Sequence, residues 1–231
     1  MKKFAKEFIN DFINLFFPSQ CMGCSAPLIP NENKICVHCQ LQIPFTYFHL
    51  DKNNPMSQKL NARMRVEVAT ALCYFEENSI IEQLIYQLKY KGQEHLGVFF
   101  GSLLEEQVKD LNHFQNIEGV IPVPLHPKRK QNRGYNQTTL FGKTIAEFLE
   151  VPFLENAIVR TKNTEQLVKA TKDRDLILEN AFRLDLKNEN SKHLLLVDDV
   201  FTTGATLHAC GSLLLKNPIN RLSIATIGYR I

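Results

Sequence analysis

The chain has 231 residues, 44% of them hydrophobic, which is enough for one well-buried α/β core and a small additional module. Its formal net charge of +3 is too small for a protein that coats nucleic acid, so any nucleic-acid contact must rest on a local basic patch. No run approaches the roughly eighteen consecutive apolar residues of a membrane-spanning helix, and the sequence therefore predicts a soluble protein.

Residues 1–17 predict an amphipathic helix. Phe4, Phe8 and Phe12 recur at helical spacing, while Lys6 and Glu7 interrupt the apolar core that a signal peptide needs. We favour docking of this helix on the rest of the protein. Attachment to a membrane surface is the alternative, although interfacial helices usually carry more Lys or Arg on the polar face.

Residues 18–48 contain two Cys-x-x-Cys pairs, formed by Cys21, Cys24, Cys36 and Cys39. Each pair can direct two thiolates at one tetrahedral ion, so the spacing predicts a four-cysteine zinc ribbon. Four thiolates leave no open position for a catalytic water, which makes the zinc structural. So short a segment has little core of its own, and the metal must supply most of its folding free energy.

Disulfides are the competing explanation for the quartet. Cys73 and Cys210 lie isolated in apolar settings and no secretory signal precedes the quartet, which favours a reducing cytoplasm. A redox role is disfavoured, because neither Cys-x-x-Cys pair follows a strand and opens a helix as thioredoxin-like chemistry requires.

After a polar linker at 49–62, residues 63–231 alternate between strand and helix patterns. Strands are expected at Val66–Phe75, Gly119–Pro124, Phe182–Leu184, His193–Val197 and Arg221–Tyr229. Helices are expected at Ser79–Tyr90, Leu96–Leu111, Thr138–Glu150 and Thr206–Lys216. This alternation predicts an α/β domain whose mostly parallel sheet is flanked by helices and binds ligands at its carboxyl edge.

The segment Pro122–Gln137 leaves one of these strands and concentrates the cations Lys128, Arg129, Lys130 and Arg133. A charge run by itself most often marks a solvated basic loop. Its position at the ligand-binding edge favours anion binding instead, with Arg129 and Arg133 gripping a pyrophosphate group bidentately. Further along, Thr161–Glu179 fits either a mobile lid over the site, with Arg174 as its lid residue, or an ordinary surface loop.

The stretch Leu194–Thr206 carries the strongest functional signal. A buried strand leads into Asp198 and Asp199 and then into a turn of threonines and a glycine that opens the next helix. The backbone N–H groups and hydroxyls of this turn can hold a phosphate, and the two acids can accept from a ribose diol. A capped helix start is the plain alternative.

The same stretch resembles the phosphoribosyl pyrophosphate (PRPP) loop of type I phosphoribosyltransferases. The resemblance assigns Asp198 and Asp199, the catalytic acids, to the ribose hydroxyls. It assigns the 5-phosphate to Thr202, Thr203, Gly204, Ala205 and Thr206.

Nearly the whole chain is similar to the ComF/GntX family, amidophosphoribosyltransferase-like proteins linked to natural competence. The motifs that carry this resemblance are the N-terminal helix, the cysteine quartet, Leu88–Gly92, the Val-Pro to Asn-Gln run at 123–137 and the VDDVFTTGAT loop. Tyr135 stands where the family usually has Phe. In the expected lid, Thr164-Glu165-Gln166 is one residue short of the family pattern, and Ile177 replaces the usual Asn.

The resemblance implies a PRPP-binding fold that uses Mg²⁺ and a role in the uptake of single-stranded DNA, with DNA-uptake machinery such as a helicase as a partner. Three hypotheses stay open. The chain is an enzyme that transfers phosphoribose to an acceptor, a PRPP or nucleotide sensor without turnover, or a DNA-uptake adaptor. Pyrophosphate release and the salt dependence of DNA binding separate them.

Overall fold

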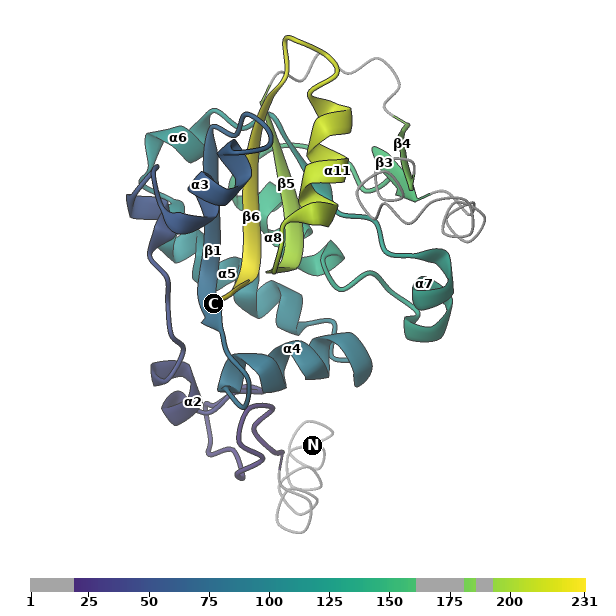
Figure 1. The fold of residues 1–231 in the computed structure, drawn as a ribbon. Helices are drawn as coiled ribbons and strands as arrows, with labels where there is room; N and C mark the ends of the chain where they lie inside the picture. The colour runs from purple at the N-terminus through teal and green to yellow at the C-terminus, as the bar shows by residue number, and fades with distance from the viewer. Residues whose placement is uncertain (1–18, 161–180, 186–192) are drawn as a thin grey trace, which may run out of the picture.

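The computed structural model describes residues 19–160, 181–185 and 193–231, and its centre is a four-stranded parallel sheet (Figure 1). The strand order is β1-β6-β5-β2, formed by β1 (Val68–Phe75), β6 (Arg221–Arg230), β5 (His193–Phe201) and β2 (Gly119–Pro122). A separate antiparallel pair joins β3 (Ile158–Arg160) to β4 (Phe182–Leu184). The mostly parallel α/β fold predicted from the sequence is confirmed.

Helices cover both faces of the sheet (Figure 1). One face packs against α4 (Ile80–Tyr90), α5 (Leu96–Val108) and α8 (Thr139–Phe148), and the other against α3 (Pro55–Asn61) and α11 (Ala205–Leu214). Successive side chains of β5 alternate between these faces. Leu195 and Val197 belong to the apolar cluster of α4, α5 and α8, whereas Leu194 and Leu196 belong to the cluster of α3 and α11.

The remaining helices are short: α2 (Val37–Leu41), the 3-10 helix η1 (Phe48–Leu50), α6 (Asn112–Gln115) and α7 (Pro127–Arg133). All five expected strands and all four expected helices are present, with boundaries that shift by up to four residues. Phe182–Leu184 lies outside the main sheet, however. None of the described helices is long and apolar enough to cross a membrane.

The expected polar linker at 49–62 contains the end of η1 and the whole of α3. Asn54 caps α3 by accepting a hydrogen bond from the Ser57 N–H at 2.9 Å, and Pro55 starts the helix without an unsatisfied donor. Met56 and Leu60 are fully buried under the sheet. The segment is too short and too polar for its pattern to show an apolar face, so only packing reveals the helix.

The basic run, expected as a loop, forms α7. His126 caps the helix through an Nδ1 that accepts from the Lys128 N–H at 3.2 Å, Pro127 starts it, and Gly134 ends it with a φ of 84°. None of the α7 residues is buried, which explains why no apolar periodicity announces the helix. In Figure 1, α7 stands away from the sheet, on the same side of the molecule as β3 and β4 and below them.

The cysteine-rich segment is packed against the rest of the protein. Cys39 and Ile35 are buried in the same apolar cluster as Ile81 of α4. The backbone near the end of this segment also contacts β1, because the Thr46 N–H donates to the Leu72 carbonyl at 3.1 Å. The domain boundaries at 18–48 and 63–231 stay a prediction, and the expected helix at 1–17 lies outside the described residues.

Candidate functional site

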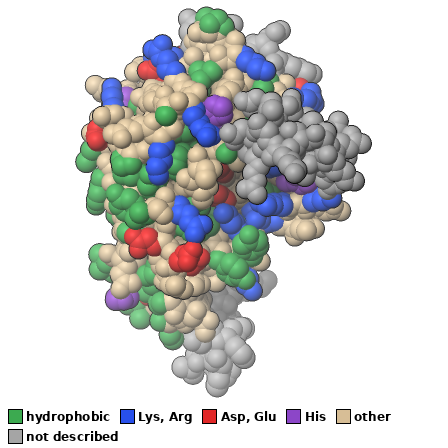
Figure 2. Space-filling model, in the orientation of Figure 1, with side chains coloured by type: hydrophobic (Ala, Val, Ile, Leu, Met, Phe, Trp, Pro, Cys, Tyr) green, Lys and Arg blue, Asp and Glu red, His purple; other side chains and the backbone are tan. Residues whose placement is uncertain are grey.

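A cavity of about 270 Å³ opens at the carboxyl ends of β5 and β2. It is lined by both members of the acid pair, by the flanks of the threonine turn, by the basic helix and by residues of α4 and β3. The charged and hydroxyl-bearing residues among them are Lys89, Tyr90, Arg129, Arg133, Arg160, Asp198, Asp199, Thr202 and Thr206. On the face shown in Figure 2, Lys and Arg side chains gather in the region of α7, beside a hollow that contains acidic side chains.

The parallel pairing of β2 with β5 brings the two sequence motifs together. Pro122 lies opposite Val197, and the Val123 N–H donates to the Val197 carbonyl at 2.9 Å. The chain that leaves β2 toward α7 therefore starts beside Asp198. Carboxyl ends of parallel strands share one edge, which is the physical reason that residues about 75 positions apart meet here.

The two acids occupy opposite sides of β5, because neighbouring strand residues point to opposite faces. Asp199 is buried on the α4 side, where its Oδ2 accepts from Lys89 Nζ at 3.0 Å and from Gln137 Nε2 at 2.7 Å. Gln137 in turn accepts from Arg133 through its Oε1. Asp199 thus anchors α4 and the end of the basic run to the strand, in addition to its place in the cavity.

Asp198 has a different environment. One of its oxygens accepts from the Asp199 N–H at 2.8 Å, and the residue remains partly exposed at the cavity. Burial of its carboxyl group, followed by the negative charge of Asp199, raises the pKa of Asp198 to about 8. The nearby Lys89 offsets this rise only in part. A cation or hydrogen-bond donors brought by a ligand are therefore expected to ionise Asp198 on binding.

The turn between β5 and α11 requires a glycine for reasons of backbone and packing. Gly204 has a φ of 75°, and a Cβ built there would lie 2.9 Å from the Phe201 ring. The side chain that Gly204 lacks would therefore point at the core, toward Phe201 and Leu60. Thr202 and Thr203 are exposed, and Thr203 Oγ1 accepts from the Ala205 N–H at 3.4 Å.

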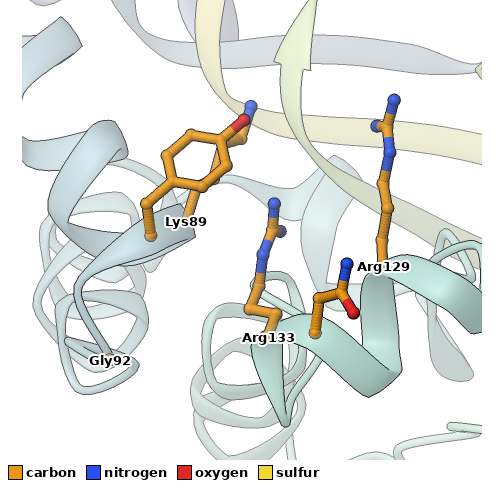
Figure 3. Close-up of a pocket in the computed structure, with 6 residues that line it drawn as sticks. Lys89, Gly92, Arg129 and Arg133 are labelled. Carbon is orange, nitrogen blue, oxygen red and sulfur yellow. The ribbon is translucent and has the colours of Figure 1, made fainter.

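The arginines predicted to bind pyrophosphate lie one turn apart on α7. Figure 3 shows Lys89, Arg129 and Arg133 around the space between α4 and α7, with the two arginines extended to the same side of their helix. These three residues also line a second cavity of about 370 Å³, together with Tyr90, Gly92 and Asn132. Arg133 stacks over the Tyr90 ring with its guanidinium carbon 5.3 Å from the ring centroid.

The end of α7 is fastened to the core by the residues that follow it. The Tyr135 hydroxyl donates to the Leu88 carbonyl, and the Asn136 amide donates to the Val123 carbonyl at 3.0 Å. A Phe at position 135, usual in the related family, would lack the first of these contacts. The contacts hold an otherwise exposed basic helix in place at the mouth of the cavity.

The structure brings together Asp198, Asp199, Thr202, Thr206, Arg129 and Arg133 around one cavity. Thr203, Gly204 and Ala205 form the intervening turn and do not line it, and Arg174 lies outside the described residues. Sequence reasoning gave no role to Lys89, Gln137 or Arg160. Lys89 and Gln137 occur in the quoted motifs without an assigned role, whereas no pattern singles out Arg160.

The cysteine quartet forms a second site, about α2 and next to α4 (Figure 1). The four Sγ atoms of Cys21, Cys24, Cys36 and Cys39 all lie within 4.8 Å of one another. The Sγ separations are 3.6 Å between Cys21 and Cys39 and 3.7 Å between Cys24 and Cys36. Two thiolates on one tetrahedral zinc ion, each about 2.3 Å from the metal, would be about 3.8 Å apart, so the donor set fits the ion.

The electrostatics of the quartet also favour a cation. Burial raises the pKa of Cys21, but the backbone N–H groups of Cys36, Cys24 and Gly23 outweigh burial and lower it to about 6. Burial and the neighbouring thiols of Cys24 and Cys36 raise the pKa of Cys39 far above its usual value. The Cys21 thiolate is thus stabilised, whereas the raised pKa values of Cys36 and Cys39 disfavour their ionisation, and a bound divalent cation would offset this.

Comparison with curated proteins finds relatives along most of the chain. The chain is 32% identical to competence protein F of Haemophilus influenzae over 226 residues, which cover 90% of this chain and 96% of that protein. It is 28% identical to DNA utilization protein YhgH of Escherichia coli strain K12 over 219 residues, which cover 88% of this chain and 93% of that protein. Competence protein ComFC of Bacillus subtilis is 27% identical over 207 residues, which cover 82% of this chain and 81% of that protein. No family model matches the chain.

Proposed function

The chain belongs to the ComF family of competence proteins, and we propose that it binds PRPP with Mg²⁺ at the carboxyl edge of its sheet and acts in the handling of DNA during uptake. The observation that supports PRPP most directly is the composition of the 270 Å³ cavity. It joins acids, threonines and arginines, the side chains that suit a sugar with phosphate at one end and pyrophosphate at the other.

In this proposal the 5-phosphate lies at the turn formed by Thr202–Thr206, where the start of α11 presents free backbone N–H groups. The ribose hydroxyls donate to Asp198, with Asp199 held beside it by Lys89 and Gln137. The pyrophosphate extends toward Arg129 and Arg133 on α7. Mg²⁺ would neutralise part of the pyrophosphate charge, and the protein contributes positioning and charge placement more than a nucleophile.

Removal of one arginine tests this orientation. We expect Arg133→Ala to weaken binding of PRPP and pyrophosphate by about tenfold to a hundredfold, the cost of one charge-assisted contact of about 1.5–3 kcal/mol. Ribose 5-phosphate, which lacks the pyrophosphate, should lose much less. Isothermal titration of the three ligands measures the difference.

Lys130→Ala is the matched control for this variant. Lys130 is an exposed cation on the same helix and does not line the 270 Å³ cavity, so its removal should change each affinity less than twofold or so. Equal losses for ribose 5-phosphate and PRPP in Arg133→Ala would contradict the assigned orientation.

Enzyme and sensor are separated by turnover. A phosphoribosyltransferase should release pyrophosphate from PRPP when the correct acceptor is present, whereas a sensor should bind PRPP and release none. A screen of nucleobases, amines and single-stranded DNA, read by pyrophosphate release, distinguishes the two. We favour the enzyme, because the acid pair lies in the same cavity as the basic helix, where a carboxylate could stabilise the positive charge that develops on the ribose during transfer.

We further propose that the ion of the cysteine quartet is zinc and that it is structural. The four-thiolate donor set and the observed Sγ separations suit tetrahedral zinc and leave no position for substrate. A reducing, cytoplasmic location, which we also propose, suits a site built from four thiolates.

A second function, contact with single-stranded nucleic acid, is favoured by a pair of exposed tyrosines on α4. The rings of Tyr86 and Tyr90 lie 5.2 Å apart, and 46% and 64% of their surfaces are exposed. Lys91 Nζ lies 5.8 Å from the Tyr86 ring and Arg133 stacks on Tyr90. Aromatic faces interleaved with cations are the usual surface for single strands, where bases stack and phosphates pair with cations.

Tyr86→Ala tests this surface without touching the cavity. We expect it to weaken binding of a fluorescent oligo-dT strand by roughly tenfold, since stacking of one base is worth about 1–3 kcal/mol. Tyr47→Ala, which removes another exposed tyrosine far along the chain from these cations, should leave the affinity unchanged. Binding that ignores salt, or that both variants reduce equally, would exclude this surface.

A further inference from the structure

Arg160 lies at the end of β3, where the β3–β4 pair meets the cavity. The residue is partly buried, and its Nε is buried without a hydrogen-bond partner. Its guanidinium carbon stacks 5.2 Å from the centroid of the Phe182 ring, which fixes the side chain without satisfying its polar hydrogens. Among the residues that the structure describes, Arg160 has no carboxylate partner.

A second guanidinium acts on Arg160 from across the cavity. Burial lowers the pKa of Arg160 from its usual value, and repulsion by Arg129 lowers it further. Arg129 projects from α7 into the same cavity and also forms no ion pair with any described residue. The repulsion between these two guanidinium groups is unfavourable in the unliganded protein. An anion bound between them would attract both and offset the repulsion.

Arg133, the other arginine predicted to bind pyrophosphate, is in a different position. Its guanidinium already donates to Gln137 and stacks on Tyr90, and through Gln137 it is linked to Asp199. Part of its hydrogen-bonding capacity is therefore used within the protein. Arg160 Nε has no partner, neither Arg129 nor Arg160 forms an ion pair with another residue that the structure describes, and the two approach the cavity from separate elements, α7 and β3.

We propose that Arg160 and Arg129 form a two-sided clamp for the pyrophosphate group of the ligand, with Arg160 as a binding residue that no sequence motif indicated. The inference rests on the PRPP site proposed above and deepens it. Two guanidinium forks can bind the non-bridging oxygens of a diphosphate bidentately, a geometry that a single phosphate held by backbone N–H groups does not need. The start of α11 already provides such N–H groups for the 5-phosphate.

The test compares three variants on the full chain, with inorganic pyrophosphate, ribose 5-phosphate and PRPP titrated by calorimetry in the presence of Mg²⁺. Arg160→Met keeps the length of the side chain and its packing on Phe182 but removes the charge. It should weaken pyrophosphate and PRPP by about tenfold or more and spare ribose 5-phosphate. Arg160→Lys keeps one charge without the fork and should fall between the parent and Arg160→Met.

Arg183→Met is the matched control. Arg183 lies on β4, the partner strand of β3. It is mostly exposed and pairs with Asp185 at 3.6 Å. The substitution therefore removes the same charge from the same strand pair, but outside the cavity. Its affinities should match those of the parent. Thermal melting of each variant shows that the hairpin and core remain folded.

The outcomes separate the clamp from the wider proposal. If the parent binds PRPP and Arg160→Met binds it equally well, the clamp is overturned and the PRPP site stands. If Arg160→Met loses ribose 5-phosphate as strongly as pyrophosphate, the arginine serves the 5-phosphate and the clamp is again overturned. If the parent binds none of the three ligands, both proposals fail.

Discussion

Replacement of Cys39 by serine is expected to release the metal ion and to unfold the cysteine-rich segment. Cys39 is completely buried, and its Sγ lies 3.6 Å from that of Cys21, so serine removes one of four ligands at the centre of the cluster. A structural zinc site contributes about 10–16 kcal/mol in small domains, which exceeds what a segment of this size gains from burial. Metal analysis should fall from one equivalent to nearly none.

The same variant should also lower the melting temperature of the sheet domain without unfolding it at room temperature. Ile35 and Cys39 cover part of α4 near Ile81, and loss of the segment would expose this apolar surface to water. Cys210→Ala is the control, because Cys210 is buried under β5, away from the quartet, and alanine keeps a small apolar side chain there. Hydrogen exchange should show protection lost over 19–48 and retained in β5.

A Cys39→Ser protein that keeps a full equivalent of metal and normal protection at 19–48 would contradict the metal-site prediction. Purified parent protein without zinc or iron under reducing conditions would contradict it as well. Loss of metal with no change in exchange would show that packing on α4, and not the ion, holds the segment together.

Asp198→Asn is expected to weaken PRPP binding by about tenfold to a hundredfold while it stabilises the unliganded protein. The amide is nearly isosteric, but it carries no charge and replaces one acceptor oxygen by a donor, so hydrogen bonds from the ribose hydroxyls are lost or weakened. The gain in stability follows from removing a carboxyl group whose charge is disfavoured in the folded protein.

The stabilisation expected of Asp198→Asn should depend on pH. The pKa of Asp198 is about 8 in the folded protein and about 4 in an unfolded chain, so between these values the native state holds a proton that the unfolded state has released. The contribution of this bound proton to the free energy of unfolding is fully present below about pH 4 and is lost as the pH rises toward 8. Melting temperatures of Asp198→Asn should therefore exceed those of the parent most at pH 8 and converge with them at low pH.

Asp199→Asn is the informative comparison. It leaves the partly buried ammonium of Lys89 without its carboxylate and should destabilise the protein by about 1–3 kcal/mol at neutral pH. Opposite stability changes in two adjacent isosteric variants are not expected of a simple helix cap. If both variants bind PRPP as tightly as the parent and have its melting temperature, the acid pair contributes neither to ligand binding nor to the hydrogen-bond network with Lys89 and Gln137. The phosphoribosyl proposal would then lose its main support.

Much of the fold follows from local sequence. The run His193–Val197, the alternation of strand and helix patterns and the apolar face of Ser79–Tyr90 each determine an element by hydrophobic periodicity alone. The spacing of the four cysteines likewise determined that they could meet, because each Cys-x-x-Cys pair is a local unit. The parallel sheet then follows from the alternation.

Elements without an apolar face of their own were decided by tertiary structure. Helix α3 in the expected linker and α7 in the basic run have few or no large apolar residues, so periodicity says nothing of them. Caps at Asn54 and His126 and a proline after each start these helices. Their place depends on what lies beside them in the fold.

The division of roles within the site was also beyond the sequence. Periodicity places Asp198 and Asp199 at the end of a strand, but which acid meets Lys89 depends on which face of β5 is covered by α4. Arg160 reaches the same cavity because the fold places the end of β3 there, and no sequence pattern around residue 160 indicates this position. Local patterns fix hydrogen bonding and burial along an element, whereas the partners of a charged side chain are set by packing between elements distant in sequence, and only the tertiary structure contains that information.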